Sequence, residues 1–182
     1  MVPEYQRIVR AIEKNIETDK KSQPGLTVRP STASDRLFLL NLSTQCVPFM
    51  FHERRHEELA NVRRRFFDIY AGLDLGEEQS AIQAWVALSD DGQPAGAILV
   101  QTDAQRALDG TWDAYIYDIS VLPEYWGSRV GVSLVENLIA ELSQRGDVGY
   151  LCGDVSTQNH RAMGLAARFG FFVESRRFFQ TL

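Results

Sequence analysis

The spacing of hydrophobic residues changes several times along the chain, and these changes predict the order of its helices and strands. Apolar residues at helical spacing predict an amphipathic helix over residues 3 to about 18, which a polar linker at Asp19–Gly25 ends. Strand formers and helical stretches then alternate. Strands are predicted at 26–30, 82–88, 96–102, 112–122, 148–155 and 172–180, and helices from Ser34 or Asp35 through Leu42 and at about 53–71, 129–144 and 159–168. This order predicts an α/β fold with a mixed sheet of the α+β kind.

Length and composition restrict the class of protein. The 182 residues suffice for one main domain, and 45% hydrophobic with 24% charged residues exclude a disordered or fibrous chain. A net charge of −5 argues against a nucleic-acid partner. No apolar run approaches a membrane span, and the first twenty residues lack the apolar core of a secretory signal. Two distant cysteines form no disulfide framework, so we expect a soluble, cytoplasmic protein without a membrane partner.

The stretch from Tyr115 to Leu134 predicts a strand that passes through a glycine-bearing turn into an amphipathic helix. The first turn of a helix has unpaired N–H groups and the positive end of the helix dipole. Glycines there let a phosphate approach the backbone closely. The segment is therefore a candidate anion site, although a glycine at such a turn also relieves crowding without binding anything.

Two separated blocks of sequence resemble motifs of the GNAT superfamily of acyl-CoA-dependent N-acyltransferases. The first block consists of Val121, Pro123 and Tyr125 followed by residues 126–131, and the second of Asn159, Ala162, Leu165, Gly170 and Phe171. The resemblance covers about residues 26–182. It implies a GNAT-type fold with an extra N-terminal helix: residues 1–25 form that helix and linker, and residues 26–182 form the acetyltransferase-like domain.

The resemblance has three departures. Trp126 stands where the family pattern has glutamine or arginine, and Arg129 replaces the central glycine of the phosphate loop. The Arg129 guanidinium offers a charge-assisted pairing with phosphate. Ala166 stands where many relatives carry a tyrosine that protonates the leaving thiolate, and alanine has no proton to donate.

The resemblance also implies a cofactor site for acetyl-CoA or another short acyl-CoA. Backbone groups of Ile119 and Val121 would hold the pantetheine arm, and Asn159 would contact the arm from the other side. The loop would take the pyrophosphate through Trp126, Gly127, Ser128, Arg129, Val130, Gly131 and Val132. No metal is implied.

Acyl transfer to an amine needs a group that removes a proton from the ammonium. Asp118 is the only carboxylate in the centre of its strand, and it is our candidate base, with a structural hydrogen-bond acceptor as the alternative. Tyr115 and Tyr117 are candidates for orienting the substrate or donating a proton. The expected reaction is direct attack by a small-molecule or peptide amine. The oligomeric state stays open, a homodimer included, and a non-catalytic acyl-CoA-binding module is the second hypothesis.

The segment His52 to His56 reads H-E-x-x-H, which is the pattern of a zinc-binding helix in many metalloproteases. Two arginines lie between the histidines and would place positive charge beside a dication, which disfavours zinc. A zinc hydrolase is therefore the third hypothesis. In the acyltransferase interpretation, His52 and Glu53 become candidate substrate contacts, and an exposed helix start is the simpler alternative. Cys152 is expected to be a buried strand residue.

Overall fold

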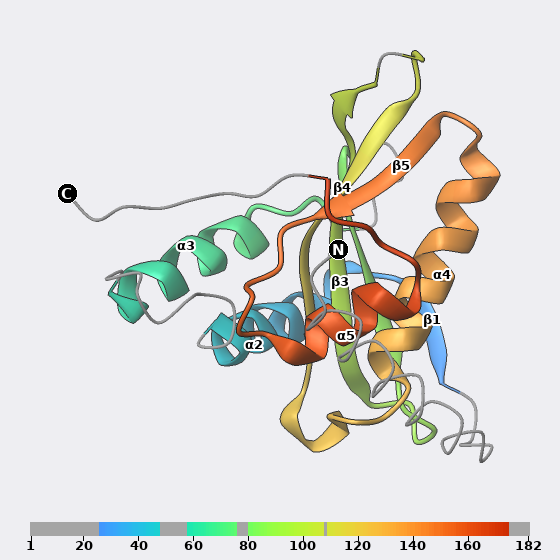
Figure 1. Ribbon diagram of the computed structural model, residues 1–182. Coiled ribbons are helices and arrows are strands. Elements are labelled where there is room, and N and C mark those ends of the chain that lie inside the picture. The colour runs from blue at the N-terminus through green and yellow to red at the C-terminus, as the bar shows by residue number, and fades with distance from the viewer. Residues whose placement is uncertain (1–25, 48–57, 76–79, 108, 175–182) are drawn as a thin grey trace.

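The computed structural model describes residues 26–47, 58–75, 80–107 and 109–174. Figure 1 shows a twisted sheet with helices packed on both of its faces. The elements in chain order are β1 (Thr27–Pro30), η1 (Ala33–Asp35), α2 (Arg36–Cys46), α3 (Leu59–Ala71), β2 (Ile82–Leu88), β3 (Pro94–Arg106), β4 (Trp112–Val121), η3 (Pro123–Tyr125), α4 (Val130–Arg145), β5 (Val148–Gly153) and α5 (His160–Arg168).

The five strands form one mixed sheet in the order β1-β2-β3-β4-β5. The first three pairings are antiparallel and the pairing of β4 with β5 is parallel. A parallel neighbour requires a crossover, and α4 supplies it between β4 and β5. The predicted mixed α/β architecture is confirmed.

The hydrophobic core has two parts because the sheet is covered on both faces. On one face, Leu134 and Leu138 of α4 pack against residues of β2, β3 and β4. On the other, Leu39 and Leu42 of α2 and Tyr70 of α3 pack against alternate residues of β2 and β3. Strands with two buried faces explain the nearly continuous apolar run of β3.

Arg36 connects the two helices on the second face. Its guanidinium donates to the carbonyl oxygen of Ala71, the last residue of α3, at 2.7 Å and to that of Leu73, just after the helix, at 2.8 Å. The contact fixes the C-terminal end of α3, where Tyr70 lies. One residue earlier, Asp35 accepts from both Arg29 and the Thr32 N–H. Asp35 is the N-cap residue of α2 by position, but its side chain does not cap that helix and instead closes a capping box with Thr32 at the start of η1.

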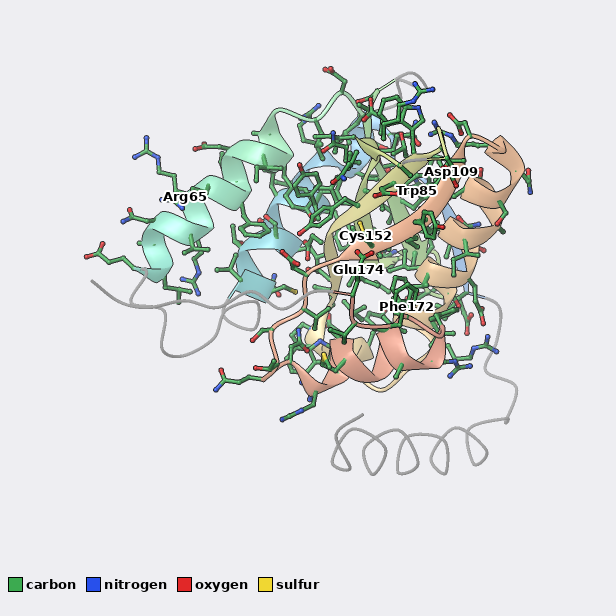
Figure 2. All side chains as sticks on the ribbon, turned by 45° about the horizontal axis from the view of Figure 1, so that its top comes forward. Arg65, Trp85, Asp109, Cys152, Phe172 and Glu174 are labelled. Atoms are coloured by element: carbon green, nitrogen blue, oxygen red, sulfur yellow. The ribbon has the colours of Figure 1, made fainter. Side chains whose placement is uncertain are left out.

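Some predicted boundaries differ from the observed ones. β3 continues to Arg106, and within the described residues α3 starts at Leu59, while 53–57 lie outside them. Residues 172–174 of the last predicted strand are not in a strand, and 175–182 lie outside the described part, as does the predicted helix at 3–18. The α3 arginines are exposed, and Figure 2 shows Arg65 projecting away from the molecule.

Candidate functional site

Asp118 is buried on the face of β4 that α2 and α3 cover, with 4% of its surface exposed. The Tyr70 hydroxyl donates a 2.5 Å hydrogen bond to its Oδ2, and the Ser120 hydroxyl lies 2.9 Å from its Oδ1. Burial raises the pKa of Asp118 to about 6, while the hydrogen bonds from Tyr70 and Ser120 act in the opposite direction. The carboxyl group is thus ionised at neutral pH but within reach of protonation.

Tyr117 is the extra residue of a β-bulge. Leu99 of β3 pairs with Asp118 and the next residue, Val100, pairs with Ile116, so Tyr117 has no partner on β3. Its hydroxyl donates to Gln101 Oε1 at 2.9 Å, and its ring meets the Tyr115 ring edge to face with centroids 5.1 Å apart. The bulge therefore turns Tyr117 outward, beside Tyr115, while Asp118 points into the core.

β4 and β5 separate at the same level. Their pairing begins at Trp112 with Val148 and ends at Ile116 with Gly153, so residues 117–121 of β4 have no partner on β5. The Leu122 N–H bonds to the Ala95 carbonyl of β3 at 2.9 Å. Because backbone groups alternate in direction along an antiparallel strand, those of residues 119 and 121 point away from β3. Ile119 and Val121 thus present N–H and C=O groups to the gap.

The turn after β4 leads directly into α4. Gly127 has φ +82°, a conformation that side chains disfavour, and the Ser128 hydroxyl donates to the Tyr125 carbonyl at 2.6 Å while accepting from the Val130 N–H at 3.3 Å. Among the described residues, no acceptor takes the N–H groups of Gly131 and Val132 in the first turn of α4. These free donors and the helix dipole fit an anionic pyrophosphate.

Two residues that depart from the family pattern have structural partners here. The Trp126 indole N–H donates to the Val121 carbonyl at 2.8 Å, and the Arg161 guanidinium lies 4.3 Å from the centre of the Trp126 ring. Arg129 forms an ion pair with Glu136 at 3.2 Å, and both side chains are about half exposed. An exposed pair of this kind contributes little, so Arg129 can exchange Glu136 for another anion.

Asn159 is the N-cap of α5, and its Oδ1 accepts from the Ala162 N–H at 3.1 Å. A Cβ added to Gly131 would lie 3.5 Å from Leu165 of α5, so α5 lies beside the start of α4. Asn159 therefore has a capping role, and its side-chain NH₂ group is the part that can contact another molecule.

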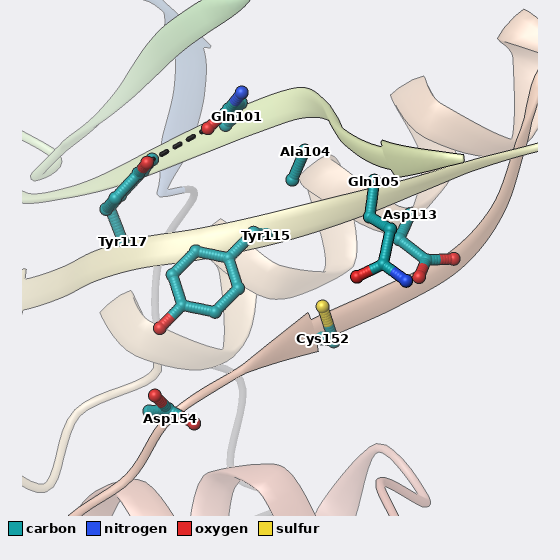
Figure 3. A pocket seen from close by; sticks show the side chains of 8 residues that line it. All are labelled: Gln101, Ala104, Gln105, Asp113, Tyr115, Tyr117, Cys152 and Asp154. Atoms are coloured by element: carbon teal, nitrogen blue, oxygen red, sulfur yellow. Dashed lines mark hydrogen bonds between the residues drawn. The ribbon is translucent and has the colours of Figure 1, made fainter. Parts of the chain in front are cut away.

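A pocket of about 380 Å³ lies on the outer halves of β3, β4 and β5, on the same face of the sheet as α3. Figure 3 shows Tyr115 and Tyr117 on one wall and Cys152 with Asp154 on another, and Asp113 at the far end. Cys152 is exposed there, so the expectation that it is a buried strand residue was wrong. Its strand lies at the edge of the described sheet, where one face stays open.

The structure thus brings some candidate residues together and leaves others apart. Tyr115 and Tyr117 share the pocket, and Ile119 and Val121 line the gap beside the loop 126–132. Asp118 faces the core side of the bulge. His52 and Glu53 lie outside the described residues.

Sequence reasoning missed two kinds of residue. Tyr70 lies in the predicted helix at about 53–71, and nothing in the helical spacing indicates a contact with a carboxylate 48 positions away. Asp113 and Asp154 were also missed. For Asp113 a signal existed, because positions 113, 115 and 117 alternate along one strand and thus share a face.

Comparison with known proteins adds a family match. The sequence profile of the acetyltransferase (GNAT) family matches residues 39–171, well over half of the chain. The matched range includes the H-E-x-x-H segment. A sequence search among curated proteins gave no match.

Solved structures of low sequence identity share the fold. A Pyrococcus furiosus protein, provisionally assigned as an acetyl transferase, superposes with a TM-score of 0.68 at 17% identity, covering 87% of this chain and 100% of its own. The aminoglycoside N-acetyltransferase AAC(6')-Iy in complex with CoA superposes with a TM-score of 0.61 at 15% identity, covering 89% of this chain and 97% of its own. The ribosomal-protein-alanine N-acetyltransferase of Brucella melitensis biovar Abortus 2308 superposes with a TM-score of 0.61 at 11% identity, covering 87% of this chain and 99% of its own.

Proposed function

Because the chain belongs to the GNAT family of acetyltransferases, we propose that it transfers an acetyl or other short acyl group from acyl-CoA to a primary amine of a small molecule or peptide. The family accounts for the general activity, acyl-CoA-dependent acetyl transfer. The acyl group, the amine and the residues that act on them are our proposal.

The observation that carries the proposal is the continuity of gap, loop and helix. The backbone groups of Ile119 and Val121 face the gap between β4 and β5, and a few residues later the free N–H groups of Gly131 and Val132 start α4. A long ligand with amide groups at one end and phosphates at the other matches this order. The Val121 carbonyl already accepts from Trp126 and the Ile119 N–H bonds to the Asp118 carboxylate, so the Val121 N–H and the Ile119 carbonyl are the groups left for the arm.

The reaction requires an acceptor amine at the gap, beside the thioester of the bound acyl-CoA. Bound acyl-CoA supplies the electrophilic thioester carbonyl and a thiolate leaving group. The amine nitrogen forms a bond to that carbon, the C–S bond breaks, and the sulfur keeps the electron pair. We propose that Asp118 takes the amine proton, directly or through a water molecule, because it is anionic at neutral pH and lies next to the bulge at Tyr117.

The leaving group needs no acid as strong as the missing tyrosine. Ala166 donates nothing, but a thiol with a pKa near roughly 8.5 leaves as a fairly stable anion. In this proposal Tyr115 and Tyr117 orient the amine through their position in the pocket, and solvent returns the proton to sulfur.

A non-catalytic acyl-CoA-binding module is the second candidate. Two observations favour it: alanine at position 166, and the occupation of Arg129 by Glu136. A zinc hydrolase is not proposed further, because the GNAT profile runs through the H-E-x-x-H segment.

The test is a thiol-release assay with acetyl-CoA over a panel of amines, together with calorimetric titration of CoA and acetyl-CoA. The proposal expects micromolar-range or tighter CoA binding and amine-dependent release. Binding without release would favour the module, and absence of binding would overturn both candidates.

The role of Asp118 is tested by Asp118→Asn. Loss of a general base lowers turnover by about 10²–10⁴-fold. CoA affinity should stay nearly unchanged, because the groups assigned to the cofactor are backbone groups that this substitution leaves in place. The matched control is Asp90→Asn in the exposed turn between β2 and β3, which should keep full turnover. Unchanged turnover in a folded Asp118→Asn protein would exclude Asp118 as the base.

A further inference from the structure

The charged side chains that line the pocket beside Tyr117 are negative among the described residues. Its lining includes the carboxylates of Asp113 and Asp154, and no lysine, arginine or histidine is among the described residues that line it. It opens next to the bulge, at the level where β4 and β5 separate. An acceptor amine reaching the gap from this face would pass along both carboxylates.

Three carboxylates act electrostatically on the Cys152 thiol, which lines the pocket. The pKa of the Cys152 thiol is raised first by burial and then by the charges of Asp113, Asp154 and Glu174. Figure 2 shows Glu174 beside Cys152. In addition, Asp113 Oδ1 is buried and has no hydrogen-bond donor among the described residues. A buried carboxylate oxygen without a donor favours a cationic ligand.

The opposite wall also suits a cation on an aliphatic chain. The two tyrosine rings pack edge to face, and the Gln101 side chain holds the Tyr117 hydroxyl. Aromatic faces attract ammonium groups and pack against methylene groups. The pocket thus offers both an apolar wall and negative charge, as seen in Figure 3.

The distance from Asp113 to the point where β4 and β5 separate follows from the number of β4 residues between them. Asp113 lies three residues before Ile116, the last β4 residue paired with β5. At roughly 3.3 Å per residue, Asp113 is about 10 Å along the strand from the point where the gap opens. This is about the separation of the two nitrogen atoms in extended 1,8-diaminooctane.

We propose that this pocket selects acceptor amines that carry a second cationic group, such as diamines or longer polyamines. One nitrogen atom is acylated at the gap, and Asp113 binds the distal ammonium group. Asp113 acts as a specificity-determining residue and takes no part in bond making. The inference rests on the proposed acyl transfer to an amine.

The test uses three acceptors of matched length with acetyl-CoA: 1,8-diaminooctane, 8-amino-1-octanol and 8-aminooctanoate. They differ only in the charge of the distal group. After correction for its two equivalent nitrogen atoms, the diamine should show a kcat/KM about tenfold above that of the alcohol, from one screened ion pair and a cation–π contact. The carboxylate should be poorer than the alcohol.

Asp113→Asn should remove the preference for the diamine and leave kcat/KM for the alcohol within about twofold. Asp90→Asn, in the exposed turn that precedes β3, should retain the full preference. If Asp113→Asn does not fold, judged by thermal unfolding, Asp154→Asn provides the same comparison. Equal kcat/KM for diamine and alcohol, or a preference that survives both substitutions, would overturn the inference.

Failure of the proposed function gives a different result. In that case no amine releases thiol although CoA binds. Calorimetric titration of 1,8-diaminooctane and 8-amino-1-octanol then measures whether the pocket prefers the diamine, independently of acyl transfer. Tighter binding of the diamine that depends on Asp113 supports the inference, and equal binding overturns it.

Discussion

The hydroxyl of Tyr70 provides a direct test of Asp118 as the base. Tyr70 is 1% exposed, and its hydroxyl donates to Asp118 Oδ2 at 2.5 Å. The substitution Tyr70→Phe removes this donor and keeps the ring packed between α2 and the sheet. Because the hydrogen bond lowers the pKa of Asp118, its loss must raise that pKa.

The size of the change follows from the hydrogen bond. A bond to a charged group contributes about 1.5–3 kcal/mol, and one pKa unit corresponds to roughly 1.4 kcal/mol. The pKa of Asp118 should therefore move from about 6 to roughly 7–8 in the variant. At pH 7 the ionised fraction of Asp118 then falls from roughly 90% to between about 10% and 50%.

The assay is the ratio of kcat/KM for wild type and Tyr70→Phe, measured with one amine and saturating acetyl-CoA from pH 5 to pH 9. The ionisation of the amine affects both proteins equally and cancels in the ratio. We expect the variant to be about tenfold to a hundredfold slower at pH 5, a value that follows from the pKa difference, and nearly equal to wild type at pH 9. Ser120→Ala, which removes the donor to Oδ1, should act in the same direction.

A deficit that is the same at every pH, in a variant that unfolds at the wild-type temperature, would refute this reasoning. Tyr70 would then support the packing of α3, and Asp118 would be a structural acceptor. A ratio of one at every pH would likewise exclude Asp118 as the titrating base.

Three further predictions concern stability and the cofactor loop. The pKa of Asp118 is raised from 3.8 to about 6 in the folded protein, so its contribution to folding stability should decrease as the pH rises from about 4 to 6. Denaturant titrations should show that the difference in free energy of unfolding between wild type and Asp118→Asn changes by about 3 kcal/mol over that window and stays constant above it. A Cβ at Gly96 would lie 2.8 Å from the Ser120 carbonyl oxygen, so Gly96→Ala should cost about 1–3 kcal/mol and weaken CoA binding by displacing β4, whereas Gly72→Ala, with its nearest contact at 3.4 Å, should be tolerated in both measurements. Gly127 has φ +82° and open space around a Cβ, so Gly127→Ala should cost about 1 kcal/mol of stability through backbone strain alone and lower CoA affinity in a calorimetric titration; wild-type values would show that the turn does not need this conformation.

The sequence pattern predicted most of the described fold because its signals are local. Helical spacing in α4 and α5 and the strand-forming runs of β2 and β4 each lie within one segment, and their observed bounds differ from the predicted ones by at most one residue at each end. The match of two separated motifs then supplied the topology. The N-terminal helix and the domain boundary at residue 25 remain predictions.

The geometry of the site depends on contacts that no local pattern contains. The bulge at Tyr117 arises from the pairing of β4 with β3, and a single strand cannot show it. The same bulge puts Asp118 on the face of β4 that Tyr115 and Tyr117 also occupy, although strict alternation along the strand would have put it on the opposite face. The sequence named these three residues together as catalytic candidates, but it could not show this arrangement. Trp126, which departs from the family pattern, bonds to the end of β4, a contact that the sequence alone does not show.

The pocket illustrates the same limit. Its carboxylates come from β4 and from the segment after β5, which are forty residues apart in the chain and become neighbours through the parallel pairing of the two strands. Charge counted over the whole sequence says only that the protein is acidic. The local excess of negative charge beside two tyrosines exists only in the folded chain.

The most direct test of the account is the release of CoA thiol from acetyl-CoA by the purified full-length protein, with mass spectrometry of the amine. We predict release that depends on an added diamine, with one acetyl group on the product and a large loss of rate in Asp118→Asn. If the protein binds CoA but no amine in the panel is acetylated, or if it binds no CoA at all, the central claim is wrong.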